Sequence, residues 1–205
     1  WNGFIAPDEL PRIVDPPSGY LVSANHRMVG EEYPHVIGHA FANGYRAYRI
    51  TERLRDKDRF HETDLLALQL DTTAQVYEFY QDLVKRLLSE SVIEGNPDLA
   101  AVRRAVEAWE GRADSDGKGF GLLVAFRRTL AASVFAPFLQ SCREQDAGFV
   151  YDGDLDTPLR TLLTEQAPAV LPDPARFADW NTFLLQQLKQ TVETLKTDYD
   201  LLSPD

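Results

Sequence analysis

Five prolines near the start of the chain constrain its fold more than any other feature. They are Pro7, Pro11, Pro16, Pro17 and Pro34. Proline removes a backbone donor and its ring clashes with the preceding turn, so an α-helix cannot propagate through this spacing. Pro16-Pro17-Ser18-Gly19 is typical of a turn, and the apolar run Tyr20–Ala24 that follows it predicts a short strand. We therefore interpret residues 1–35 as a β/loop segment.

The remainder of the chain has helical periodicity. Apolar residues recur at steps of three and four along Val76–Leu88, Leu122–Phe138 and Trp180–Tyr199, as on one face of an α-helix. Thr63 is placed as a helix N-cap, and Pro97 suits the first turn of a new helix. The sequence thus predicts a helical region over residues 36–205 and a mainly α fold class with a short β segment at the N-terminus.

Composition excludes several classes of function. The 205 residues carry a formal net charge of −11, with 44% hydrophobic and 26% charged residues, which is typical of a globular chain. The acidic balance argues against a nucleic-acid partner, which needs clustered Lys and Arg, and against an anionic membrane surface. No apolar run reaches about 18 residues, so the sequence predicts no transmembrane helix.

The sequence matches known catalytic and metal-binding motifs only weakly. Cys142 falls inside an apolar helical stripe, which predicts a buried structural thiol. His35 and His39 share a helical spacing but lack the H-E-x-x-H frame, so they predict no metal site. The aspartates of 152–156 would need a Glu at the twelfth position to form an EF-hand loop, and that position is Leu163. We interpret them as turn and helix-cap residues.

Four segments, taken in order, resemble a known family. They are the lead-in Gly3–Pro11, the turn and strand Asp15–His26 with its Ala24-Asn25, Tyr33-Pro34, and Tyr45–Ile50 with its Arg46-Ala47-Tyr48-Arg49. This order is similar to the heavy chain of the penicillin acylase (penicillin amidase) family. Leu70-Asp71 and Trp109-Glu110-Gly111 followed by Asp114-Ser115 extend the resemblance to about residue 130.

The resemblance implies a fold and a set of site residues. Members are N-terminal-nucleophile hydrolases with a four-layer αββα core, in which a Ser freed by self-cleavage attacks an amide carbonyl. Matching the family's motif makes Asn25 an oxyanion-hole donor and Arg49 a residue that supports the active site. His26 stands where the family often has a second Asn. A structural ion pair is an equal alternative for Arg49.

The resemblance also implies what surrounds this chain. The chain lacks an initiator Met, and we expect an internal heavy-chain fragment, inactive alone, with its nucleophile elsewhere in the precursor. Expected partners are the light chain, the rest of the heavy chain and a small N-acyl amide substrate, in a periplasmic or secreted protein. We expect no cofactor in this fragment. Calcium can bind in the parent, but Val36–Gly38, near its usual ligand position, has no carboxylate. The alternative is a non-catalytic helical binding or interaction module.

Overall fold

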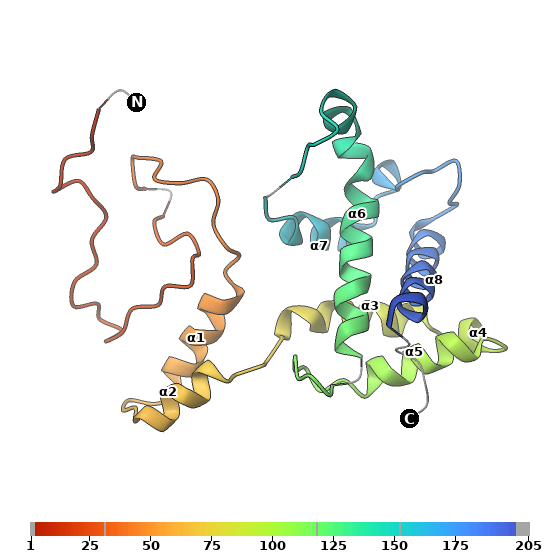
Figure 1. Ribbon diagram of the computed structural model, residues 1–205, viewed down its shortest axis with the longest axis horizontal. Helices are drawn as coiled ribbons and strands as arrows, with labels where there is room; N and C mark the ends of the chain where they lie inside the picture. The colour runs from red at the N-terminus through yellow and green to blue at the C-terminus, as the bar shows by residue number, and fades with distance from the viewer. Residues whose placement is uncertain (1–2, 31, 118, 152, 200–205) are drawn as a thin grey trace. The chain divides into compact units, whose positions relative to one another are not determined.

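The computed structural model describes residues 3–30, 32–117, 119–151 and 153–199, and this part of the chain is mainly α (Figure 1). It forms two compact units. Unit 1 comprises the described residues of 1–71 with those of 152–154, and unit 2 comprises the others. The helices, in chain order, are α1 (Tyr45–Arg55), α2 (Glu62–Gln69), the 3-10 turn η1 (Gln75–Tyr77), α3 (Glu78–Leu87), α4 (Glu90–Ile93), α5 (Pro97–Glu107), α6 (Phe120–Gln145), α7 (Asp156–Glu165), the 3-10 turn η2 (Pro168–Val170) and α8 (Trp180–Tyr199).

The proline-rich start of unit 1 is non-helical, as predicted, but the strand expected at residues 20–24 is absent from it. A strand needs a neighbour that accepts and donates its backbone hydrogen bonds. Near this segment, Ala42 N–H donates to the Asn25 carbonyl at 2.8 Å, and the Ala24 carbonyl accepts from the Arg46 side chain at 2.9 Å. The described residues hold no ladder partner, so the segment remains extended loop.

Helix starts follow local capping. α2 begins at Glu62, and the Asp64 carboxylate accepts from the backbone N–H of His61 at 3.0 Å. The N-cap is therefore His61, and the prediction of Thr63 as the cap is wrong. α5 begins at Pro97 as predicted, and the side chain of Asn96 caps it by accepting from Leu99 N–H at 3.1 Å.

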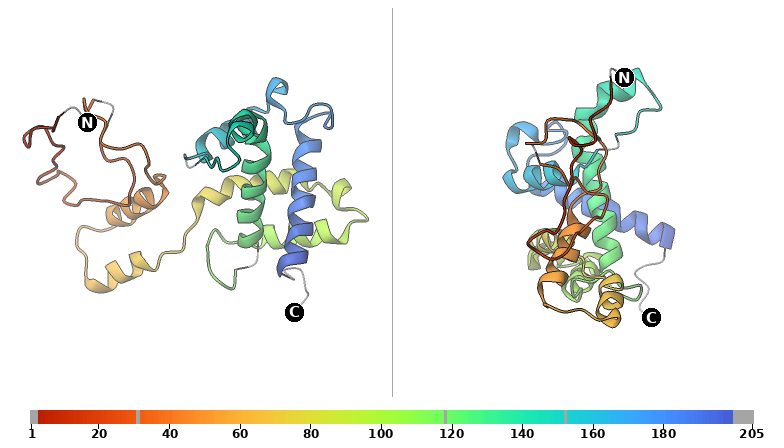
Figure 2. Two further views of the ribbon diagram at one scale, coloured as in Figure 1. Left: turned by 45° about the horizontal axis from the view of Figure 1, so that its top comes forward. Right: turned by 90° about the vertical axis from the view of Figure 1, so that its left-hand side faces the viewer.

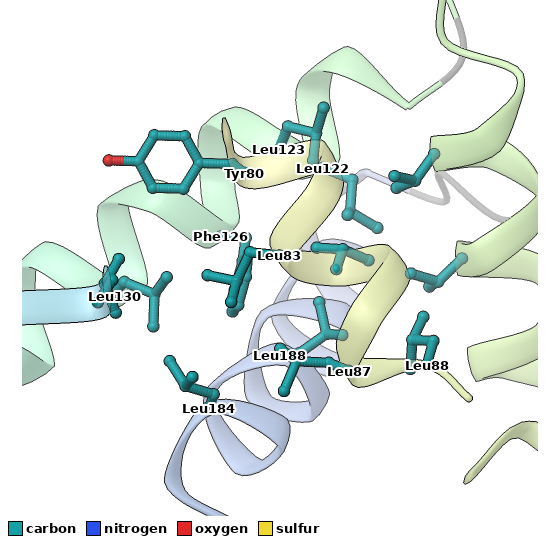
Figure 3. Close-up of a cluster of buried hydrophobic side chains, with 14 of the residues drawn as sticks. Tyr80, Leu83, Leu87, Leu88, Leu122, Leu123, Phe126, Leu130, Leu184 and Leu188 are labelled. Atoms are coloured by element: carbon teal, nitrogen blue, oxygen red, sulfur yellow. The ribbon is translucent and has the colours of Figure 1, made fainter. Parts of the chain in front are cut away.

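Unit 2 contains the hydrophobic core. The predicted apolar stripes lie on α3, α6 and α8, and their side chains meet in one cluster (Figure 3). α6 packs against α8, which lies beside it in the left view of Figure 2, and α5 adds a further buried face. Burial of each such Leu, Val or Phe side chain contributes about 1.5–3 kcal/mol. Unit 2 therefore has a core of its own.

The last turns of α6 project beyond this core. Burial along α6 ends at Phe135, Phe138 is 53% exposed, and Cys142 is also exposed. The prediction of a buried thiol is wrong because the helix continues past the elements that cover its apolar stripe. By length and composition α6 could cross a membrane, with a mean hydropathy of 1.5 over its most apolar window. Its inner face, which includes Phe126, Leu130 and Val134, packs into the core instead.

One charged group is fully buried among the described residues of unit 2. The Asp156 carboxylate, 0% exposed, accepts from the Tyr80 hydroxyl at 3.0 Å and from Arg127 Nε at 2.6 Å. Burial lowers the pKa of Arg127, but the hydrogen bond and charge of Asp156 outweigh this effect and raise it. Burial and the Asp156 charge also raise the pKa of Tyr80 well above its usual value. This trio joins α3, α6 and α7. Asp152, in the same predicted aspartate cluster, lies outside the described residues.

Gly119 has no room for a side chain. Its φ of +93° is in the left-handed region, and a Cβ would lie 2.4 Å from the Ala105 carbonyl oxygen. We expect Gly119→Ala to lower the free energy of unfolding by about 2–4 kcal/mol, because it adds backbone strain to overpacking. Urea unfolding of the 205-residue chain measures this effect.

The matched control is Gly121→Ala, two residues further on in α6, where a Cβ would meet no atom within 4 Å. There alanine should stabilise the chain by up to about 1 kcal/mol because of its higher helix propensity. Equal effects of the two substitutions would contradict the close contact at Gly119.

Candidate functional site

Asn25, the predicted oxyanion donor, occupies a strained backbone position in unit 1. Its φ of +61° lies in the left-handed region, which Asn tolerates better than most residues. The Ala42 N–H donates to its carbonyl at 2.8 Å, and the adjacent Ala24 is buried. The loop therefore presents the exposed Asn25 side chain from a fixed backbone.

Arg46 determines which way the Asn25 amide faces. Its Nη2 donates to Asn25 Oδ1 at 2.9 Å and to the Ala24 carbonyl at 2.9 Å. A guanidinium has only donors, so the amide must present its oxygen to Arg46. The Nδ2 group then points away from Arg46, and no protein acceptor for it occurs among the described residues. The geometry leaves a neutral, oriented N–H donor facing outward.

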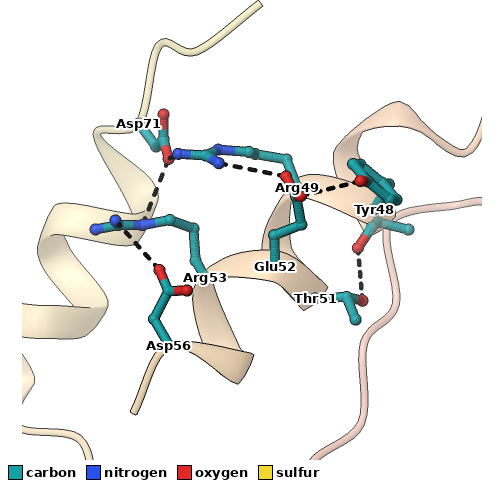
Figure 4. Close-up of polar contacts among 8 residues, drawn as sticks. Tyr48, Arg49, Thr51, Glu52, Arg53, Asp56 and Asp71 are labelled. Atoms are coloured by element: carbon teal, nitrogen blue, oxygen red, sulfur yellow. Dashed lines mark hydrogen bonds and ion pairs between the residues drawn. The ribbon is translucent and has the colours of Figure 1, made fainter. Parts of the chain in front are cut away.

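Arg49 lies one turn later on α1 and has different partners. Its Nε and Nη2 donate to Asp71 Oδ2 at 2.8 and 2.7 Å, and its Nη1 lies 3.4 Å from Glu52 (Figure 4). Arg53 Nε also reaches Asp71, at 3.5 Å. Burial lowers the pKa of Arg49, and the Asp71 and Glu52 carboxylates raise it more. The network ties α1 to Asp71, the second residue after the end of α2.

The structure thus brings Arg46, and not Arg49, to Asn25. Both arginines were visible in the sequence as one helical face, because positions three apart are neighbours on a helix. Which of the two arginines contacts Asn25 depends on where the loop that carries Asn25 packs against α1. The Ala42–Asn25 backbone hydrogen bond fixes that position, and no local pattern in the sequence encodes it.

His26, next to Asn25, carries an unsatisfied nitrogen. Its Nδ1 is buried from solvent and has no hydrogen-bond partner among the described residues. A buried polar atom without a partner costs about 1–3 kcal/mol. His26 directly follows Asn25, the candidate oxyanion donor, in the sequence.

The surface of unit 1 is unusually apolar. Its buried apolar side chains, among the residues described, are Ala24 and Ala47. The exposed large ones are Phe4, Leu10, Ile13, Val14, Leu21, Met28, Val36, Ile37, Phe41, Tyr48, Leu65, Leu66 and Leu70. Large exposed apolar patches are typical of surfaces that contact other protein.

The histidine pair forms no metal centre in the described part of the chain, where no three His, Cys, Asp or Glu side chains gather closely enough to hold an ion. His35 instead makes an edge-to-face contact with Tyr33, with ring centroids 5.7 Å apart.

Comparison with known proteins shows the family of the chain. The family model described as penicillin amidase matches residues 1–204. The penicillin acylase 2 proenzyme of Pseudomonas sp. (strain SE83) is 33% identical over 136 residues, which cover 66% of this chain and 17% of that protein. The chain belongs to the penicillin amidase family, and it spans about a sixth of the length of this relative.

Proposed function

We propose that this chain is the part of an acyl-amide hydrolase that supplies an oxyanion-hole donor, Asn25. The observation that carries the proposal is the Arg46–Asn25 contact at 2.9 Å, which leaves the Asn25 Nδ2 group facing outward. A tetrahedral oxyanion is stabilised by donors that are already oriented before the reaction. An Asn amide donates without titrating near neutral pH.

The nucleophile in this proposal is an N-terminal Ser outside this chain. The Ser hydroxyl attacks the carbonyl carbon of an N-acyl amide, and its α-amine accepts the hydroxyl proton and passes it to the amine of the substrate, which leaves. Water then hydrolyses the acyl-Ser ester, which releases the acid and regenerates the Ser. Asn25 stabilises the negative charge that develops on the carbonyl oxygen. The fragment should be inactive alone, because it holds a donor for the oxyanion but no attacking group.

The apolar surface of unit 1 supports the proposed partners, which are the other segments of the same precursor. Unit 1 exposes Phe4 (97%) and Val36 (73%) almost fully. The relative is a proenzyme much longer than the matched stretch. In the parent, residues 20–24 would gain the strand neighbours that they lack here and join an αββα core. A partner from that core would also satisfy His26 Nδ1.

The intact mass of the full-length parent after maturation tests this proposal. We expect two chains, of which the heavier begins with Ser and contains this segment. A single uncleaved chain without an internal Ser of that kind would overturn the proposal and favour the non-catalytic helical binding module.

Arg46 should act as a positioning residue. In the full-length parent, Arg46→Lys keeps the charge, but its shorter side chain cannot place a nitrogen where Nη2 donates to both Ala24 and Asn25. We expect kcat to fall about 10- to 100-fold with little change in KM, because misorientation of a donor affects the transition state more than the bound substrate. Steady-state kinetics on a small N-acyl amide measures both constants.

Two further substitutions on α1 serve as comparisons. Arg55→Lys changes an exposed arginine of the same helix and should leave kcat unchanged. Arg49→Lys breaks the paired contact with Asp71, so we expect a loss of stability that exceeds its effect on kcat. An equal fall in kcat for Arg46→Lys and Arg55→Lys would contradict the positioning role.

A further inference from the structure

A groove of about 570 Å³ lies in unit 2, and none of the candidate-site residues lines it. One wall is the end of α3 and the start of α4, and the other is the first half of α8 with the turn that precedes it. Small-molecule sites in proteins are commonly about 300–1,000 Å³ in volume. The groove is therefore large enough for a ligand of modest size.

The charge around this groove is opposite to that of the chain. Arg86, Arg176 and Lys189 line it, and no acidic residue does so among the lining residues that the structure describes. None of the three takes part in an ion pair within the described ranges, in a chain whose net charge is −11. Uncompensated cations that converge on one concavity attract an anion.

Part of the lining of the groove is apolar. Leu87, Phe177 and Leu185 contribute to it, and the Arg176 guanidinium stacks over the Phe177 ring at 5.1 Å from the ring centroid. Stacking restrains a guanidinium while its N–H groups stay available for hydrogen bonds. The groove thus combines apolar lining with one stacked guanidinium and two further exposed cations.

We propose that this groove binds a small organic oxyanion, an apolar body that bears a carboxylate. The apolar body lies against Phe177 and Leu185, and the carboxylate accepts hydrogen bonds from Arg176 and Lys189, with Arg86 adding charge from the opposite wall. Charge-assisted pairs of this kind are about twice as strong as neutral hydrogen bonds. The site is separate from the proposed amide hydrolysis and requires no turnover.

Calorimetric titration of the full-length parent with 2-naphthoate tests the proposal, and the neutral 2-naphthylmethanol serves as the comparison ligand. The groove variant is Arg176→Gln with Lys189→Gln. The control variant, Arg104→Gln with Arg128→Gln, makes the same change in net charge at exposed residues of α5 and α6 that do not line the groove. Urea midpoints establish that both variants are folded.

We expect naphthoate to bind the wild type and the control variant equally, and the groove variant at least tenfold more weakly. The Lys189→Arg variant should retain binding, and the alcohol should bind all proteins weakly. Equal naphthoate affinity in both double variants would overturn the proposal, and so would equal binding of acid and alcohol. Failure of the wild type to bind naphthoate would overturn it as well, because another segment of the parent would then cover the groove.

Discussion

Asn25→Ala in the full-length parent should lower kcat by about 10²- to 10³-fold while KM changes little. Loss of one preoriented oxyanion donor raises the barrier by about 2.7–4 kcal/mol, and the donor acts mainly in the transition state. Steady-state kinetics with a small N-acyl amide measures the effect. Asn25→Gly should lose as much activity, because it keeps the left-handed backbone but has no amide.

The backbone itself needs a control, since alanine at a positive φ is strained. Asp15 has a φ of +47° in the same proline-rich segment, and Asp15→Ala imposes a similar strain without removing the amide. We expect this variant to keep wild-type kcat. If Asp15→Ala lost as much activity as Asn25→Ala, the loss would come from loop distortion, and Asn25 would have no role as a donor.

Asp156→Ala should lower the free energy of unfolding of the chain by about 3–5 kcal/mol. Removing one partner of a buried ion pair leaves the other charge uncompensated, and here it also leaves the buried Tyr80 hydroxyl without its acceptor. Urea unfolding measures the change. We expect no effect on the orientation of Asn25, which belongs to unit 1.

Asp98→Ala is the matched control for this substitution. Asp98 pairs with Lys196 at 2.5 Å, but its side chain is 48% exposed, and solvent screens surface pairs. Its loss should change stability far less than the loss of Asp156. Comparable losses in the two variants would contradict the view that burial makes the Asp156 contacts important.

The helices were predictable because their signals are local. The stripes on α3, α6 and α8 repeat within each helix, and Pro97 and Asn96 mark the start of α5 within four residues. The absence of the strand predicted at 20–24 could not be foreseen in this way, because strand pairing depends on residues far away in the sequence. For the same reason the exposure of Phe138 and Cys142 was missed. Periodicity predicts which face of a helix is apolar, but not how far along the helix other elements pack against that face.

The site shows the same division between local and distant information. Asn25 was predicted as a site residue through its resemblance to the family motif, and the structure adds a contact that the motif could not specify, the hydrogen bond from Arg46. The role of Asp156 was missed because its partners, Tyr80 and Arg127, are 76 and 29 positions away. From the sequence alone, an aspartate in a turn-rich segment is interpreted as a helix-cap residue, because its distant partners are not visible.

The most direct test of the central claim is a crystal structure of the mature full-length parent with an alkyl boronic acid bound to its nucleophile. The tetrahedral boronate imitates the intermediate. We expect one boronate oxygen to lie about 2.7–3.1 Å from Asn25 Nδ2, with Asn25 Oδ1 still held by Arg46. An Asn25 amide that faces away from the boronate, with every donor coming from other residues, would contradict the account.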